Sequence, residues 1–147
     1  MLRVLLALSM LLAVACGARG DAQDIELASA LATRFLEQLD AGEARESWPA
    51  LASPLRASAP ESSWPDQIAR MRAPLGGPIS RQLASALFTE TLEGAPNGQY
   101  FVVEFESQFA DAACGERVVA MFEQGAWRIA GYVIRNTRPL GARRETP

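Results

Sequence analysis

The chain has 147 residues, of which 49% are hydrophobic and 21% are charged, and its formal net charge is −3. This length and composition describe one globular domain, and they exclude a disordered chain and a pair of full-sized domains. The mildly acidic charge excludes the basic surface that binding to nucleic acid requires.

The sequence contains neither histidine nor lysine, so all 14 of its basic residues are arginines. Without an imidazole there is no Ser-His or Cys-His nucleophile and no histidine-based zinc site. Without lysine there is no Schiff base. We therefore expect no metal and no cofactor, and the composition favours a protein that is not an enzyme. Any catalysis would have to depend on a carboxylate or a tyrosine.

The first residues have the pattern of a bacterial export signal. Arg3 supplies a positive charge, residues 4–14 are almost wholly apolar, and small residues follow. This pattern is typical of a secretory signal peptide, and the apolar run is too short to span a bilayer. We expect a signal peptide over residues 1–15, with cleavage as late as residue 22 as the alternative. The protein is then exported to the periplasm or to a membrane of the bacterial envelope.

Cys16 directly follows the expected signal peptide and is preceded by the small residue Ala15. One interpretation is a bacterial lipoprotein site, in which Cys16 carries a lipid anchor; the other is ordinary cleavage without lipid. The signal pattern does not separate the two. A lipid on Cys16 is the only membrane contact that we expect. Cys114 is interpreted as a small buried side chain, because the sequence has no Lys or His to activate its thiol.

Beyond the signal, the chain divides into a tether over residues 16–23, one folded domain over residues 24–136 and a loose tail over residues 137–147. Asp24 is the expected N-cap of a first long helix, and Gly42 stands where its C-cap glycine belongs. Apolar residues at helical spacing predict its buried face, namely Ile25, Ala28, Ala32, Phe35 and Leu39.

Two shorter helices are expected next. The first covers residues 43–52, where Pro49 distorts or restarts it because a proline inside a helix loses a hydrogen bond. The second covers residues 64–72, with Pro65 in its first turn, where a missing N–H costs little.

From residue 79 the apolar spacing changes from helical to alternating. The expected strands cover residues 80–92, 99–109, 116–123 and 127–135. On the second strand one face carries Phe101, Val103, Phe105 and Phe109, and the opposite face carries Tyr100, Val102, Glu104, Glu106 and Gln108. Helices followed by hairpin-linked strands predict an α+β fold, with N-terminal helices packed on a curved, antiparallel four-stranded sheet in a cone-shaped, cystatin-like arrangement.

Arginines and acids provide the first candidate site. Arg72 and Arg81 flank a Pro-Gly turn and either clamp an anionic ligand or form structural ion pairs with Glu104, Glu106 or Glu116. The ion pair is the preferred interpretation. Glu104 and Glu106 share one strand face, which is typical of a solvated surface. Asp40 is interpreted as a helix-end residue without metal-ligand spacing.

Aromatic residues provide the second candidate site. Trp48, Trp64, Trp127 and Tyr132 either pack in the core, which we prefer, or line a ligand cavity between helices and sheet. In a regular strand Trp127 and Tyr132 lie on opposite faces, so at most one of them faces such a cavity.

An ordered set of short motifs resembles a bacterial exported family, catalogued as domain of unknown function 4019. The motifs are Trp48, Trp64, the segment of residues 72–76, Arg81, the segment of residues 96–100, and Trp127 with Gly131-Tyr132. The resemblance spans roughly residues 24–135, and Glu116 matches a glutamate of the family. It implies an export signal and a small α+β fold similar to nuclear-transport-factor-two-like domains, and it implies no established activity.

The sequence therefore predicts an exported binding or interaction module without enzymatic activity, whose partner is an envelope protein or a small ligand. The candidate ligand-binding residues are Arg72, Arg81, Glu116 and Tyr132. Homodimerisation through the sheet face is a further expectation, and an exposed apolar patch around Tyr100 and Val102 would favour it. The alternatives are a small carboxylate- or tyrosine-dependent enzyme with a pocket inside the cone, and a structural envelope lipoprotein.

Overall fold

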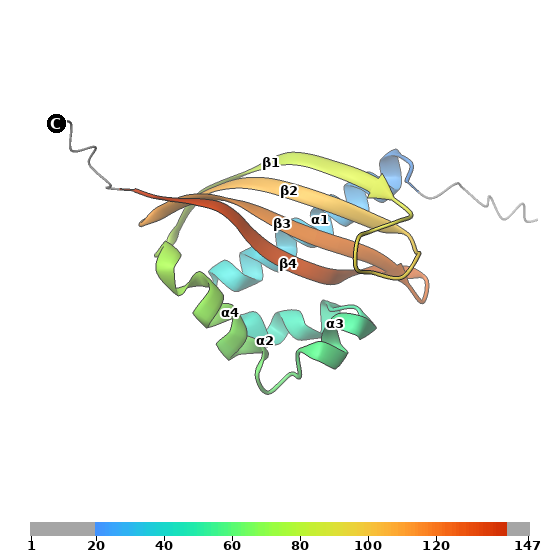
Figure 1. Cartoon of the computed structure of the whole chain (residues 1–147), viewed down its shortest axis with the longest axis horizontal. Coiled ribbons are helices and arrows are strands. Elements are labelled where there is room, and N and C mark those ends of the chain that lie inside the picture. The colour runs from blue at the N-terminus through green and yellow to red at the C-terminus, as the bar shows by residue number, and fades with distance from the viewer. Residues whose placement is uncertain (1–19, 141–147) are drawn as a thin grey trace, which may run out of the picture.

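A computed structural model describes residues 20–140 and shows an α+β domain in which helices lie on one side of a curved sheet (Figure 1). The helices are α1 (Ala22–Asp40), α2 (Ala44–Ser47), α3 (Ser53–Ser58) and α4 (Trp64–Arg72), with short 3-10 turns at Trp48–Ala50 and Ala73–Leu75. The strands are β1 (Pro78–Thr89), β2 (Tyr100–Phe109), β3 (Ala112–Glu123) and β4 (Ala126–Pro139), antiparallel in the order β1-β2-β3-β4. The predicted fold class is confirmed.

The signal peptide, the lipidation site at Cys16, most of the tether and the last residues of the tail lie outside the described residues. None of the helices within residues 20–140 combines the length and the apolar character that crossing a bilayer requires.

The first helix begins earlier than predicted. Its N-cap is Asp21, whose carboxylate accepts a hydrogen bond from the Asp24 N–H (2.9 Å). Asp24 instead lies buried in the first turn, where it accepts a hydrogen bond from Trp127 Nε1 (3.0 Å). Ile25, predicted to face the core, is 39% exposed, whereas the rest of the predicted apolar stripe is buried. Gly42 follows the helix end in the left-handed region (φ 78°), as expected.

The helices after α1 differ in detail from the prediction. The expected helix over residues 43–52 ends at Ser47 and continues as a 3-10 turn that contains Pro49. The bounds of α4 match the prediction. The prediction missed α3, whose first N–H, that of Ser53, donates to the Glu123 carboxylate (2.9 Å). That partner lies on a distant strand, but Pro54 in the first turn is the same local signal that α4 has in Pro65.

β3 and β4 are longer than predicted at the end of the sheet where the chain turns from β2 into β3. β3 begins at Ala112, and β4 continues to Pro139, into residues that we expected to be loose. Pairing of Ala112 with Pro139 and of Ala113 with Arg138 accounts for both extensions.

A register shift in β4 corrects the prediction for Trp127 and Tyr132. The pairing moves from Val119–Gly131 to Ala120–Ile129, so one extra residue of β4 forms a bulge. Trp127 therefore contacts the Phe101 ring (4.9 Å between centroids), and Tyr132 contacts the Phe35 ring (5.7 Å). Both aromatics lie on the inner face, because the bulge interrupts the alternation on which the prediction depended.

The core lies between α1 and the inner face of the sheet. From α1 it receives Ala28, Ala32, Phe35, Leu36 and Leu39, and from the strands it receives Phe101, Val103, Phe105, Val118, Ala120 and Ile129. The predicted inward face of β2 is confirmed. On the outer face, Tyr100 is only 1% exposed and donates its hydroxyl hydrogen to the Pro96 carbonyl (2.8 Å). Tyr100 therefore adds nothing to an exposed apolar patch on this face, and homodimerisation through the sheet face stays a prediction.

Candidate functional site

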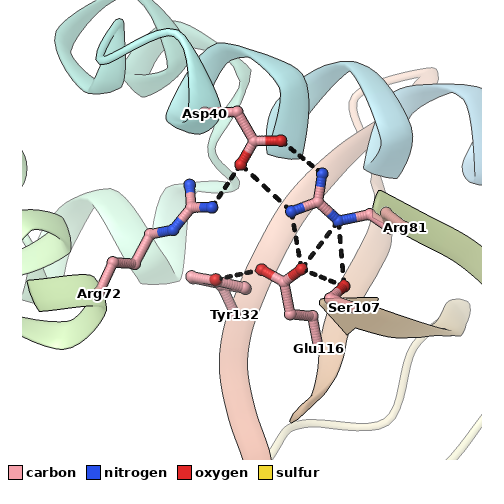
Figure 2. Close-up of polar contacts among 6 residues, drawn as sticks. All are labelled: Asp40, Arg72, Arg81, Ser107, Glu116 and Tyr132. Carbon is pink, nitrogen blue, oxygen red and sulfur yellow. Dashed lines mark hydrogen bonds and ion pairs between the residues drawn. The ribbon is translucent and has the colours of Figure 1, made fainter. Parts of the chain in front are cut away.

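Six polar side chains, each from a different helix or strand, meet at one end of the sheet (Figure 2). We call them the polar cluster: Asp40 ends α1, Arg72 ends α4, Arg81 lies on β1, Ser107 on β2, Glu116 on β3 and Tyr132 on β4. The cluster therefore connects the helical layer to all four strands.

Glu116 is fully buried, and both of its carboxylate oxygens are occupied. Oε1 accepts a hydrogen bond from the Tyr132 hydroxyl (2.5 Å). Oε2 accepts hydrogen bonds from Arg81 Nε (2.8 Å) and from the Ser107 hydroxyl (2.5 Å), and it also lies 2.7 Å from Arg81 Nη2. A buried carboxylate is tolerated only with such compensation.

The Arg81 guanidinium lies between the two acids of the cluster (Figure 2). Opposite Glu116, it donates to Asp40 Oδ2 (2.6 Å) and Oδ1 (3.2 Å). Arg72 Nη2 donates to the same Oδ1, and the Arg72 guanidinium lies over the Phe109 ring, 5.3 Å from its centroid. Arg72 Nη1 is buried and has no hydrogen-bond partner among the described residues.

The pKa shifts follow from this geometry. Burial acts to raise the pKa of Asp40, but hydrogen bonds from Arg81 and Arg72 outweigh burial and hold the pKa below its ordinary value. Burial and the neighbouring Glu116 carboxylate raise the pKa of Tyr132, so its phenol stays protonated and donates. Although burial lowers it, the pKa of Arg81 rises because of its acidic partners. Two guanidinium groups thus balance two carboxylates.

The structure brings together all four candidate ligand-binding residues, Arg72, Arg81, Glu116 and Tyr132. The preferred ion pair of Arg81 with Glu116 is present, whereas Glu104 pairs on the outer face with Arg117 (2.5 Å) and Arg135 (3.6 Å). A role of the four residues in ligand binding stays a prediction.

The sequence reasoning missed Asp40 and Ser107. Asp40 was interpreted as a helix-end residue, and its position at the end of α1 gives no sign of two arginine partners. A signal for Ser107 existed: it is the polar residue between Phe105 and Phe109 on the apolar face of β2, and a polar side chain buried there needs a partner.

The four aromatic candidates pack, and the polar atom of each has a partner within the chain. Trp48 Nε1 donates to the Ala59 carbonyl (2.9 Å) and Trp64 Nε1 to the Ser47 hydroxyl (3.0 Å). The partners of Trp127 and Tyr132 are Asp24 and Glu116. These contacts match the preferred interpretation of core packing.

A groove of about 390 Å³ lies next to the polar cluster, between the end of α1 and α4. Leu39, Ala44 and Ile68 form its buried apolar floor, and Asp40 and Arg72 line its polar end. Within residues 20–140 no three His, Cys, Asp or Glu side chains lie close enough together to hold a metal ion. The groove combines apolar contact surface with the Arg72 guanidinium and the carboxylates of Asp40 and Asp66.

These features define a small α+β domain whose helices and sheet are joined by buried ion pairs. The chain belongs to the family described as "Protein of unknown function (DUF4019)", whose model matches residues 31–132 and so includes the whole polar cluster. No curated protein matches the sequence. The likeness to nuclear-transport-factor-two-like and cystatin-like folds stays a prediction.

Proposed function

We propose that this protein is a non-enzymatic binding module of the bacterial cell envelope and that its ligand occupies the groove between α1 and α4. The observation that carries the proposal is the combination, in one groove, of a buried apolar floor and the Arg72 side chain, which is 11% exposed. Sites of this kind bind an apolar body and orient it through a few polar groups. The ligand class is therefore a molecule or peptide with an apolar part and a carboxylate or carbonyl group.

The polar cluster supports binding rather than catalysis. Glu116 is fully buried, so a dissolved substrate does not reach it, and both of its oxygens are already occupied. Tyr132, whose pKa is raised, does not supply a base near neutral pH. The carboxylate- or tyrosine-dependent enzyme that the sequence left open has its two best residues engaged in holding the fold.

The position of the groove suits a protein tethered by its N-terminus. The 19 residues of α1 span about 28 Å, and the groove lies beside Asp40 at the C-terminal end of this helix. A lipid anchor at Cys16 would precede the opposite end of the helix. The anchor would then join the domain at the end of α1 opposite the groove.

If the protein is exported as proposed, its measured mass should be that of a chain from which the signal peptide has been removed. The protein purified from cell envelopes should lack residues 1–15 and carry lipid on Cys16, because the apolar run and the small residues before Cys16 form a processing site. Intact-mass measurement tests both points, with Cys16→Ala as the unlipidated control. A chain that keeps residues 1–15 contradicts export, and an unmodified Cys16 contradicts the anchor.

The groove predicts a loss of ligand in Ala69→Glu. Ala69 is exposed on α4 and lines the groove, so a glutamate there fills the groove and repels an anionic ligand without disturbing the core. Ala30→Glu, on the exposed side of α1, is the matched control. Envelope extract is passed over both variants and the wild type, retained molecules are identified by mass spectrometry, and their affinities are measured by calorimetry.

We expect the wild type and Ala30→Glu to retain the same molecule, and we expect Ala69→Glu to bind it at least about tenfold more weakly, a difference of about 1.4 kcal/mol. Equal retention by all three proteins would place the ligand outside the groove. If none of them retains a specific molecule, the structural envelope lipoprotein is the better account.

A further inference from the structure

The outer face of the sheet lies opposite α1 (Figure 1) and contains a hollow of about 380 Å³ at the end where the chain turns from β2 into β3. We call it the outer hollow. β3 supplies its floor, and the other three strands supply side chains that can form hydrogen bonds, namely Ser80, Gln82, Glu106, Gln108, Asn136 and Arg138. None of these six side chains has a hydrogen-bond or ion-pair partner within residues 20–140. Their polar groups are therefore free to bind a ligand.

Gly115 lies in the floor of the outer hollow, inside β3, where it pairs with Glu106 on β2 and with Arg135 on β4. A glycine inside a strand costs stability. Neither its backbone nor its packing requires one here. Its φ lies outside the left-handed region, and an added Cβ would meet its nearest heavy atom, the Arg135 carbonyl oxygen, at 3.7 Å, an ordinary contact. A strand glycine that the fold does not require is typical of a place where a ligand approaches the backbone closely.

Asn136 marks a bulge in β4 beside the same hollow. Between the pairs Gly115–Arg135 and Ala113–Arg138, β4 has one residue more than β3, and Asn136 within this bulge has a φ of 52°. The left-handed region is unfavourable for a residue other than glycine, and bulges often redirect side chains next to functional sites. Two features that cost stability thus meet at the outer hollow, and both shape its surface.

The charges around the outer hollow indicate the class of ligand. Glu106 and Arg138 carry opposite charges, so the lining favours neither an anion nor a cation. The other polar groups are three amides and one hydroxyl, and each of them can both donate and accept a hydrogen bond. Groups of this kind match a ligand without net charge that also donates and accepts at several neighbouring positions. Hydroxyl groups on a sugar ring have these properties.

We propose that the outer hollow binds a neutral saccharide. Its ring lies against Gly115, where no side chain covers the backbone, and its hydroxyl groups form hydrogen bonds with the amides of Gln82, Gln108 and Asn136. The volume of the hollow lies within the range of small-molecule sites, so it holds a small sugar or the end of a longer glycan. This site is separate from the groove between α1 and α4, and neither depends on the other.

The first test uses a panel of neutral mono- and disaccharides of glucose, galactose, mannose and N-acetylglucosamine. Calorimetry and saturation-transfer NMR should show that the wild type binds at least one of them with a Kd below about 1 mM. Gly115→Val should bind that sugar at least about tenfold more weakly, because its side chain occupies the floor. Gly131→Val is the matched control: an added Cβ there also has its nearest heavy atom at 3.7 Å, but Gly131 does not line the outer hollow. Circular dichroism shows whether each variant is folded.

A second pair of variants tests the amides without filling the hollow. Gln108→Leu removes one amide and should weaken binding about tenfold, because a hydroxyl of the bound sugar loses its partner. Gln23→Leu, at an exposed position of α1, should bind like the wild type. This pair decides the question if Gly115→Val does not fold.

Three results would overturn the proposal. They are a wild type that binds no sugar of the panel at about 10 mM, equal binding by Gly115→Val or Gln108→Leu and its control, and binding of N-acetyl-trialanine amide in place of any sugar. Ala69→Glu, which fills the groove, should bind the sugar like the wild type. The saccharide site and the proposed function of the groove can therefore fail separately.

Discussion

Replacing Glu116 by alanine should lower the free energy of unfolding by about 3–5 kcal/mol, the range for breaking a buried ion pair, because Arg81 and Arg72 are then left to share Asp40 and one buried positive charge is uncompensated. Glu116 is fully buried and accepts hydrogen bonds from Arg81, Ser107 and Tyr132. Its loss also leaves the two hydroxyl groups without an acceptor. Urea unfolding at neutral pH, followed by tryptophan fluorescence, measures the change.

Glu104→Ala is the matched control. Glu104 also lies on a strand and contacts two arginines, Arg117 and Arg135, but on the outer face, where the three side chains are partly exposed. Surface ion pairs contribute about 0–1 kcal/mol, so the control should remain close to the wild type. If both variants lost a similar amount of unfolding free energy, burial would not be the reason for the contribution of Glu116 to stability.

Asp40→Asn should be destabilised by about 1.5–3 kcal/mol at neutral pH, the range for hydrogen bonds to charged groups. The pKa of Asp40 is below its ordinary value of 3.8, because its hydrogen bonds with Arg81 and Arg72 outweigh burial. The stabilisation from the ionised form is therefore fully present above pH 3.8 and is lost as the pH falls through the lowered pKa. The difference in unfolding free energy between the wild type and Asp40→Asn should therefore disappear in that acidic range.

Unfolding curves from neutral pH down to the acid limit of the folded state test this dependence. Glu37→Gln is the control, since Glu37 is exposed on the same helix and forms no ion pair within the described residues. We expect it to follow the wild type. A difference between the wild type and Asp40→Asn that stays constant from neutral to acidic pH would rule out the ionised Asp40 as its source.

The polar cluster and the groove share Asp40 and Arg72. A ligand in the groove that contacts Arg72 would therefore touch a side chain that also holds α4 against α1 and, through Asp40 and Arg81, against the sheet. Ligand binding in the groove should then raise the free energy of unfolding of the whole domain by linkage, with the logarithm of one plus the ratio of free ligand concentration to Kd. The ion pair of Arg72 with Asp40 also fixes the position of α4 relative to α1, the two helices between which the groove lies.

Much of the fold could be predicted, because its main signals are local. The apolar spacing of α1, the proline in the first turn of α4 and the alternation along β2 each depend on residues a few positions apart. The errors arose where a distant residue decides the structure. Asp24 is not the N-cap of α1: its carboxylate accepts hydrogen bonds from Trp127 on β4 and from the Gly20 N–H. α3 is the exception, because Pro54 in its first turn was a local signal that the prediction overlooked.

The residues of the candidate site likewise divide into those that have a local signal in the sequence and those that distant contacts bring to the site. Four of its six residues could be singled out, because arginines, a glutamate and a tyrosine near turns and on apolar strand faces are unusual enough to notice. Asp40 could not, since its only local feature is the end of a helix. Neither could the shared inner face of Trp127 and Tyr132, because the bulge between them shows only in the pairing of β4 with β3.

The amino-acid sequence by itself determined the class of fold, the order of helices and strands, and the absence of histidine and lysine chemistry, because composition and periodicity are properties of the chain alone. Only the tertiary structure decided that six side chains form one network and that this network borders a groove; the six are Asp40, Arg72, Arg81, Ser107, Glu116 and Tyr132. Contacts between residues far apart in the chain depend on how the layers pack, and electrostatic energy depends on the burial that this packing produces.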